Sequence, residues 1–188
     1  RPLNGRGRDG GPRGLKPWNG PFQRRGRMAD VERLWAPWRS AFVSVRRRRS
    51  CIFCRARSAV RDRKRHVVAR GRYAFCLLNR YPYNNGHLLL APYRHVGKLE
   101  QLRSEEGVEL FSLSVALTRR LTRRLHPDGF NLGINVGKSG GAGVAGHLHL
   151  HVVPRWTGDT NFMPVLSRTK VLPQSLDELY TLLKADGR

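Results

Sequence analysis

The sequence is poor in cysteine and has no long apolar run. Its three cysteines, Cys51, Cys54 and Cys76, are too few for a disulfide framework. No apolar stretch approaches the roughly 20 residues of a membrane-spanning helix, and the basic N-terminus lacks the apolar segment of a secretory signal. These absences argue against a disulfide-rich secreted scaffold and against a membrane-spanning protein. We therefore expect a soluble chain in the reducing cytoplasm.

Acidic residues are also scarce. The 36 lysines and arginines outnumber 13 aspartates and glutamates, giving a formal net charge of +23, which favours an anionic substrate or partner. Much of this charge lies in residues 1–27 and 39–72. A GC-rich genome that favours arginine on solvated surfaces explains the runs as well as a nucleic-acid-binding groove does. Nucleic-acid binding through the basic tail is thus an alternative that we do not expect.

A chain of 188 residues accommodates one domain and a tail. Residues 1–27 contain seven glycines, four prolines and almost no aliphatic residues, a composition that cannot offset the entropy lost on folding. We predict a disordered basic tail there and a catalytic domain over residues 28–188. Because the first methionine is Met28, residues 1–27 fit either a native tail or residues upstream of the true translation start.

Strand patterns alternate with turns in the middle of the chain. Residues 73–78 and 87–91 predict two antiparallel strands around a turn at residues 82–86. Residues 131–136 predict another strand, and residues 147–153 a further one that ends at Pro154.

One long amphipathic helix is predicted to begin at Ser104, whose hydroxyl can cap free amides, and to end at Pro127 and Gly129. Shorter helices are expected at residues 31–38 and 174–184. The fold class is therefore α+β, an antiparallel sheet with one main helix and short terminal helices. The apolar face of the main helix repeats at steps of three and four residues, at Leu110, Leu113, Leu117, Leu121 and Leu125.

Three histidines alternate with apolar residues at positions 147–152. On a strand, His147, His149 and His151 would share one face. A neutral imidazole is a competent nucleophile near pH 7, and it is also a metal ligand. The preceding glycine-rich loop at residues 137–146 can bring backbone amides close to a phosphate, and Lys138 adds positive charge. This pattern favours chemistry at a phosphate.

A rival interpretation is a P-loop, because Gly137-Lys138-Ser139 matches the end of G-x-x-x-x-G-K-[ST]. The match fails, since Leu132 stands where the first glycine is required. In addition, a strand pattern follows the loop, not the helix that cradles phosphate in a P-loop.

The run Gly146-His147-Leu148-His149-Leu150-His151-Val152-Val153 resembles the motif of the histidine-triad (HIT) family. Residues 78–82, 86–87 and 92–95 resemble the family's upstream segments, so the resemblance covers roughly residues 28–188. Within the family, the chain is most similar to bacterial diadenosine tetraphosphate phosphorylase-like members. The segments that carry this likeness are residues 34–39, 135–143 and 154–156.

The resemblance implies a HIT-like fold, a homodimer and an enzyme acting on dinucleoside polyphosphates. The implied reaction has two steps: His149 attacks the α-phosphorus of the substrate, and phosphate or water then resolves the nucleotidyl-histidine. His87 would support the triad, Asn79 could instead cap a turn, and Trp156 could instead be core. The implied substrate-binding residues, with Lys138 added from the loop chemistry, are Asn79, Asn135, Lys138, Gly141, Ala142, Gly143, Val144, His151 and Trp156.

One departure concerns the acceptor. Many triad hydrolases carry Ser, Thr or Gln just before the motif, where this chain has Val144-Ala145-Gly146. This departure favours phosphate over water. Two alternative functions remain: a hydrolase of nucleoside phosphoramidates or adenylyl conjugates, and a basic zinc-containing nucleic-acid-binding module.

A single C-x-x-C pair supplies only two of the four ligands of a structural zinc site. The resemblance implies that His95 and His147 complete the set, giving one structural zinc on Cys51, Cys54, His95 and His147 and no organic cofactor. The alternative is a metal-free pair of buried thiols. Cys76 is more simply a core residue.

Overall fold

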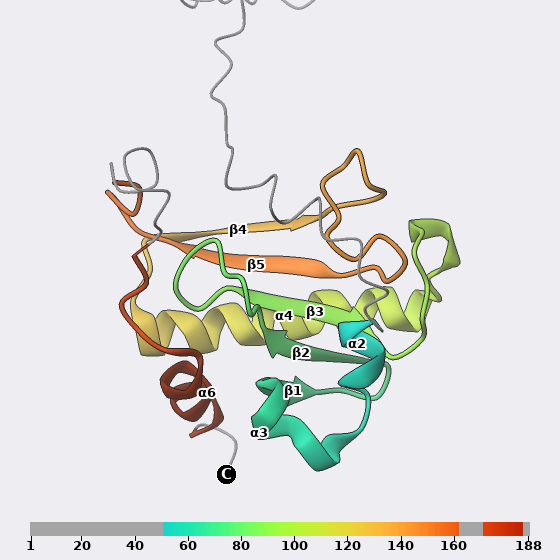
Figure 1. Ribbon diagram of the computed structural model, residues 1–188, viewed down its shortest axis with the longest axis horizontal. Helices are drawn as coiled ribbons and strands as arrows, with labels where there is room; N and C mark the ends of the chain where they lie inside the picture. The colour runs from blue at the N-terminus through green and yellow to red at the C-terminus, as the bar shows by residue number, and fades with distance from the viewer. Residues whose placement is uncertain (1–50, 162–170, 186–188) are drawn as a thin grey trace, which may run out of the picture. The chain divides into compact units, whose positions relative to one another are not determined.

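The computed structural model describes residues 51–161 and 171–185. Within these ranges the chain forms a five-stranded antiparallel sheet of order β1-β2-β3-β5-β4 (Figure 1). The α+β prediction is confirmed. The strands are β1 (Val67–Arg70), β2 (Ala74–Leu78), β3 (Leu88–Pro92), β4 (Gly129–Ile134) and β5 (Leu150–Arg155).

The main helix, α4 (Ser104–Leu125), covers one face of the sheet and lies behind it in Figure 1. Its leucines pack on the strand residues of that face and on α6 (Leu176–Lys184). The predicted cap is wrong: Ser104 is the first helical residue, and the Glu106 carboxylate accepts the Arg103 N–H at 2.9 Å instead. The helix ends at Leu125 because His126 adopts a left-handed conformation.

The opposite face of the sheet carries a second apolar cluster. Phe75 and Leu77 of β2 point there because side chains alternate along a strand. The short helix α2 (Ile52–Arg55) lies over this face, in front of the sheet in Figure 1, and inserts Phe53 into the cluster. Cys76, between the two, faces α4 and is buried in the core as expected; burial raises the pKa of its thiol.

Two predicted strands have the wrong bounds. The strand predicted at residues 131–136 lies two residues earlier, and β5 begins only at Leu150. β5 also continues through Pro154, because its pairing with β3 ends at Val152. The carbonyl of Pro154 accepts from the Asn84 side chain and so points away from β4. The nitrogen of Pro154 points to the same side, where no strand pairs with this residue, so its lack of an N–H costs no ladder hydrogen bond.

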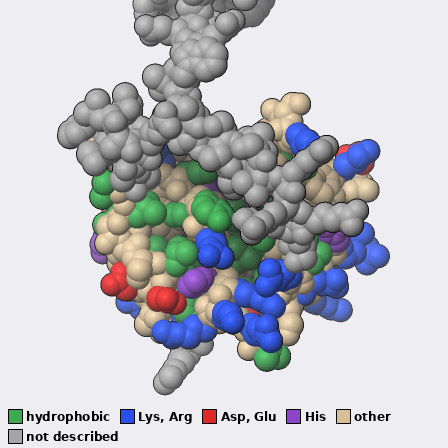
Figure 2. Space-filling view, viewed as in Figure 1, with side chains coloured by type: hydrophobic (Ala, Val, Ile, Leu, Met, Phe, Trp, Pro, Cys, Tyr) green, Lys and Arg blue, Asp and Glu red, His purple; other side chains and the backbone are tan. Residues whose placement is uncertain are grey.

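The connection from α2 to β1 carries unusually dense positive charge. It contains a short 3₁₀ turn (Ala59–Arg61) and α3 (Asp62–Arg65). Lys and Arg side chains gather on the lower part of the face in Figure 2, where Figure 1 places α3. A further 3₁₀ turn, Leu99–Gln101, precedes α4.

Several expectations fall on residues outside the described ranges. These are the disordered tail at residues 1–27, the domain start near Met28 and the short helix at residues 31–38. In the described part of the chain, no helix combines the length and apolarity needed to cross a membrane.

Candidate active site and metal centre

His149 lies in the extended segment just before β5 and is 4% exposed. Its Nδ1 atom is 2.8 Å from the backbone carbonyl oxygen of His147. Because a carbonyl oxygen only accepts, Nδ1 must carry the ring proton in the neutral imidazole. The Nε2 atom of His149 is then unprotonated, which is the state that a nucleophile requires.

His151, on β5, is given the opposite tautomer by its neighbours. The Tyr83 backbone N–H donates to His87 Nδ1 at 3.0 Å, so the His87 proton lies on Nε2. His87 Nε2 is 2.9 Å from His151 Nδ1 and donates to it. His151 therefore carries its proton on Nε2, which is buried and has no hydrogen-bond partner among the described residues. A buried unpaired donor is ready for an anionic ligand.

Burial also sets the charge state of these rings. It lowers the pKa of His87 to about 3 and that of His151 to about 4, and electrostatic repulsion between the histidines adds to the shift. Burial lowers the pKa of His149 as well. All three imidazoles are thereby held neutral near pH 7, which keeps the hydrogen-bond directions fixed.

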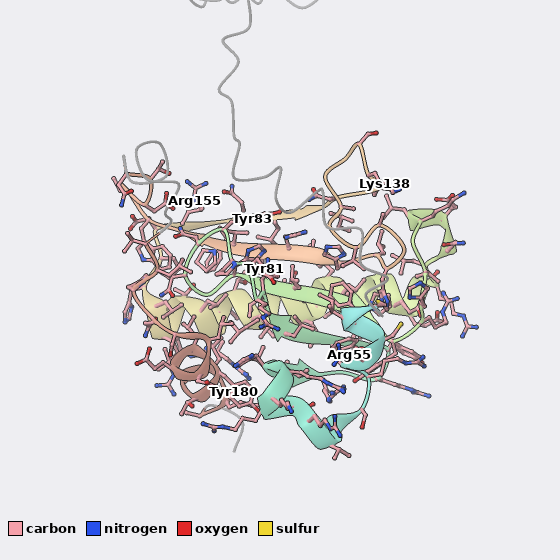
Figure 3. The ribbon with its side chains drawn as sticks, viewed as in Figure 1. Arg55, Tyr81, Tyr83, Lys138, Arg155 and Tyr180 are labelled. Carbon is pink, nitrogen blue, oxygen red and sulfur yellow. The ribbon has the colours of Figure 1, made fainter. Side chains whose placement is uncertain are left out.

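Tyr83 covers one side of this histidine group. Its ring stacks on His151 at 5.7 Å between centroids with an interplanar angle of 7°, and it lies 4.7 Å from the His87 ring. Figure 3 shows Tyr81 and Tyr83 on the connection between β2 and β3, over the face on which the histidines lie. No sequence signal singled out Tyr83, because a tyrosine in a turn is usually an ordinary surface residue.

Asn79, predicted to contact the substrate, lies at the start of the same connection. Its Oδ1 atom accepts the Tyr81 N–H at 3.0 Å, and its Nδ2 atom is 3.2 Å from His87 Nδ1. The Asn79 side chain thus caps the turn, which was the alternative role predicted for it, and it also contacts His87. Its role towards a substrate stays a prediction.

The glycine-rich loop follows β4 and folds back on itself. Gly137 and Gly141 have φ values of 71° and 84°, which side chains other than glycine rarely adopt. The N–H groups of Gly141 and Ala142 close the turn onto the carbonyls of Lys138 and Gly137. These two amides are occupied, so phosphate contacts from them would require the turn to open.

The remaining predicted loop residues lie around this turn. Asn135 donates to the Gly141 carbonyl at 3.5 Å, and Lys138 is exposed on the loop (Figure 3). Gly143 is exposed, whereas Val144 is partly buried and packs against the Phe53 cluster. The loop therefore adjoins the triad face, and the substrate roles of its residues stay predictions.

Trp156 is not brought to the triad. It follows the last residue of β5, five positions beyond His151, which corresponds to roughly 16 Å along a strand. Its indole N–H donates to the His126 carbonyl at 3.1 Å. Within one chain the residue anchors the end of α4, and its predicted substrate contact is untested.

Four side chains predicted to bind zinc converge at one point. Cys51, Cys54, His95 and His147 place their ligand atoms within 4.8 Å of one another. Cys51 Sγ lies 3.3 Å from His147 Nδ1, Cys54 Sγ lies 3.2 Å from His95 Nδ1, and the two Nδ1 atoms are 3.2 Å apart. His147 is buried, whereas His95 is exposed, so the cluster lies at the protein surface.

The donor set fits a tetrahedral zinc ion. Ordinary Zn–S and Zn–N bond lengths place two ligand nitrogens about 3.3 Å apart, and a sulfur and a nitrogen about 3.6 Å apart. In addition, His147 Nε2 is 2.9 Å from the Pro92 carbonyl and donates to it, which leaves the Nδ1 lone pair directed at the cysteines. The geometry fits the four predicted ligands.

Comparison with known proteins gives the family. A model described as the HIT domain matches residues 60–158. AP-4-A phosphorylase of Mycobacterium tuberculosis (strain ATCC 25618 / H37Rv) is 38% identical over 169 residues, covering 86% of this chain and 87% of that relative. Bis(5'-adenosyl)-triphosphatase of Dictyostelium discoideum is 32% identical over 82 residues, covering 44% and 54%. A Zn-bound histidine triad family protein from Mycobacterium smegmatis has a TM-score of 0.59 at 29% identity, covering 72% and 91%.

The chain therefore belongs to the HIT domain family. The expectation of a HIT-family enzyme is confirmed at the level of the family. The family match begins at residue 60, after α2, so Cys51 and Cys54 lie outside it.

Proposed function

We propose that this enzyme transfers a nucleotidyl group from a dinucleoside polyphosphate to His149, and then to phosphate or water. One observation carries the proposal: two adjacent histidines hold opposite tautomers. His149 offers an unprotonated Nε2 atom, and His151 offers an unpaired buried N–H donor. Their ring centroids are 4.9 Å apart. One phosphate can therefore meet a nucleophile and a hydrogen-bond donor together.

The first step follows from this arrangement. The Nε2 lone pair of His149 attacks the α-phosphorus, and the bond to the bridging oxygen breaks with its electron pair on the leaving nucleotide. The His151 N–H donates to a non-bridging oxygen, where negative charge is concentrated. The His147 carbonyl stabilises the imidazolium that His149 becomes, because it already accepts from Nδ1.

In the second step the acceptor displaces His149 from phosphorus. With diadenosine tetraphosphate as substrate, the first step releases ATP. Water then gives AMP, and inorganic phosphate gives ADP. The relatives named AP-4-A phosphorylase and bis(5'-adenosyl)-triphosphatase support this substrate class. The net charge of +23 also supports a polyanionic substrate.

Purified protein incubated with diadenosine tetraphosphate tests the proposal. Chromatography should show ATP with AMP in phosphate-free buffer, or ATP with ADP in phosphate buffer. His149→Ala should abolish both, and mass spectrometry of the wild type should place one adenylyl group on the His149 peptide. His66→Asn, a histidine substitution away from the triad, is the matched control. Absence of turnover by the wild type, or full turnover by His149→Ala, contradicts the proposal.

The same first step serves nucleoside phosphoramidates and adenylyl conjugates, so these compounds belong in the same assay. Higher kcat/KM for a phosphoramidate than for diadenosine tetraphosphate would favour that alternative. The nucleic-acid-binding alternative predicts tight, salt-dependent RNA binding that survives deletion of residues 1–27.

We infer that Cys51, Cys54, His95 and His147 bind one structural zinc ion per chain. The convergence of four ligand atoms supports this site, as does the Zn-bound neighbour from Mycobacterium smegmatis. When bound, the ion would tie α2 to the triad segment. Elemental analysis of reduced protein should give one zinc per chain for the wild type and for Cys76→Ala, but not for Cys54→Ala. Less than about a tenth of an equivalent in the wild type would exclude the site.

We also propose that two chains pair as a homodimer through β4. This strand lies at the edge of the sheet and exposes Leu132 and Ile134, and α4 exposes Phe111 beside it at 67%. Sedimentation should give the mass of two chains for the wild type and of one chain for Leu132→Asp. Val60→Asp, a change at an exposed residue near α3, should leave the mass unchanged. A wild-type protein that sediments as one chain contradicts the proposal.

A further inference from the structure

Phe53 joins the metal cluster to the nucleophile. It lies between the two cysteines of the C-x-x-C segment and is completely buried. Its ring centroid is 5.0 Å from that of His147, with an interplanar angle of 45°. It is also 4.9 Å from that of His149, with an angle of 35°. One side chain thus contacts both a proposed metal ligand and the proposed nucleophile.

The segment that carries Phe53 is fixed at both ends. On one side, Cys51 and Cys54 lie within 3.7 Å of histidine ring nitrogens in the metal cluster. On the other side, the guanidinium of Arg70 donates to the carbonyls of Ala56, Arg57 and Ser58, just after α2. Arg70 is itself held by the Asp62 carboxylate. Phe53 therefore has little freedom to move away from the histidines.

The nucleophile needs such a support. The hydrogen bond from His149 Nδ1 to the His147 carbonyl fixes one ring atom, but the ring can still swing about it. The outer torsion of a histidine side chain has a broad energy profile, so it does not set the ring plane by itself. Contact with the Phe53 ring restricts that plane, and with it the direction of the attacking Nε2 lone pair.

We propose that Phe53 is a positioning residue that aligns the His149 ring for attack, and that zinc binding at the C-x-x-C segment strengthens this alignment. This inference rests on the proposed nucleotidyl transfer to His149. Phe53 carries no group that reacts; it acts through its contact with the His149 ring.

The chain offers a matched control in Phe75. This residue is also completely buried and belongs to the same apolar cluster as Phe53. Its ring stacks on Tyr93 at 5.1 Å, and no ring contact with a histidine is found for it among the described residues. Phe53→Leu and Phe75→Leu remove the same group from the same cluster. Phe53 contacts His147 and His149, whereas Phe75 contacts Tyr93 and the Arg70 guanidinium.

The kinetic test compares these two variants with zinc content measured in both. We expect Phe53→Leu to lower kcat about tenfold or more with KM changed less than about twofold, because ground-state binding is retained while alignment is lost. Phe75→Leu should keep kcat within about twofold of the wild type at a similar loss of stability. Equal effects on kcat overturn the positioning role. Loss of zinc from Phe53→Leu alone overturns it in favour of a role in metal retention.

A second measurement does not depend on turnover. In nitrogen-15 NMR spectra of the imidazoles, the His149 signals should shift in Phe53→Leu and stay in place in Phe75→Leu. Chelation of the wild type should move the same signals; unchanged His149 signals after chelation overturn the link to zinc. A wild type without turnover refutes the proposed function, and the spectra still decide whether Phe53 positions the ring.

Discussion

His87 Nε2 lies 2.9 Å from His151 Nδ1, and this contact determines which nitrogen of His151 carries a proton. The direction is fixed upstream, because the Tyr83 N–H points at the other nitrogen of His87. The Tyr83 backbone amide therefore determines, through the His87 ring, that the Nε2 atom of His151 carries the proton. His87 contributes to the chemistry through the tautomer of its neighbour.

This relationship predicts different outcomes for two substitutions of His87. Glutamine can present an amide N–H near the position of Nε2, whereas leucine fills the space without a donor. We expect His87→Leu to lower kcat by roughly ten- to a hundredfold, the equivalent of one lost hydrogen bond and a free tautomer. His87→Gln should recover much of that loss. Steady-state kinetics of both variants measure the difference, and equal kcat values would mean that the tautomer of His151 is not set by His87.

The pKa of about 3 for His87 predicts a pH-dependent stability. In the unfolded chain this histidine takes up a proton below about pH 6.5, but in the folded chain it stays neutral. The unfolded state therefore binds more protons, and the free energy of unfolding falls as the pH is lowered from 6.5 towards 3. One such histidine removes about 2 kcal/mol between pH 7 and pH 5.

Urea unfolding at pH 7 and pH 5 measures this contribution as a difference between proteins. His87→Gln should lose about 2 kcal/mol less than the wild type over that interval. Protonation of the proposed metal ligands affects both proteins alike and cancels. An identical pH dependence in both would show that His87 is accessible to protons in the folded state.

Local sequence patterns predicted much of the fold. Leucines at helical spacing marked the buried stripe of α4, and the turn containing Asn84-Asn85-Gly86 marked the antiparallel pair β2 and β3. Boundaries that depend on neighbouring strands were wrong. β5 begins at Leu150 and continues through Pro154 because its pairing with β3 covers only residues 150–152. The residues of β5 alone do not indicate where that pairing begins or ends.

The candidate site divides in the same way. The alternation of histidines and the C-x-x-C spacing marked residues that are close in sequence or share a family motif. Tyr83 and Phe53 were missed because their importance lies in ring contacts with histidines 68 and 96 positions further along the chain. A phenylalanine in a sequence predicts only packing in the core. The contact between Phe53 and His149 arises from the fold.

Glu106 anchors the loop that carries His95. The carboxylate is 3% exposed and accepts from Arg94 Nε and one Arg94 terminal nitrogen, both at 2.7 Å. These bonds hold the pKa of Glu106 below its usual range. We expect Glu106→Gln to lower the free energy of unfolding by about 1–3 kcal/mol and to weaken zinc binding, because the residue next to His95 loses its charged partner. Glu105→Gln, at the exposed neighbouring position, should change neither. Urea unfolding and competition with a zinc-binding dye test both effects, and equal behaviour of the two variants would argue against the anchor.

Zinc removal should lower the stability of the folded chain by an amount that depends on how tightly the ion binds. A ligand present at about a thousand times its dissociation constant adds about 4 kcal/mol, which for a domain of this size corresponds to a melting temperature about 10 °C higher. We therefore expect a chelator to lower the melting temperature of the wild type by about that amount. The double variant Cys51→Ala/Cys54→Ala should melt at the lower temperature with or without chelator, because it lacks both thiolates of the cluster. Calorimetry with all four combinations measures the effect. A wild type that melts at the same temperature with and without chelator would mean that the cysteine and histidine cluster contributes no metal-dependent stability.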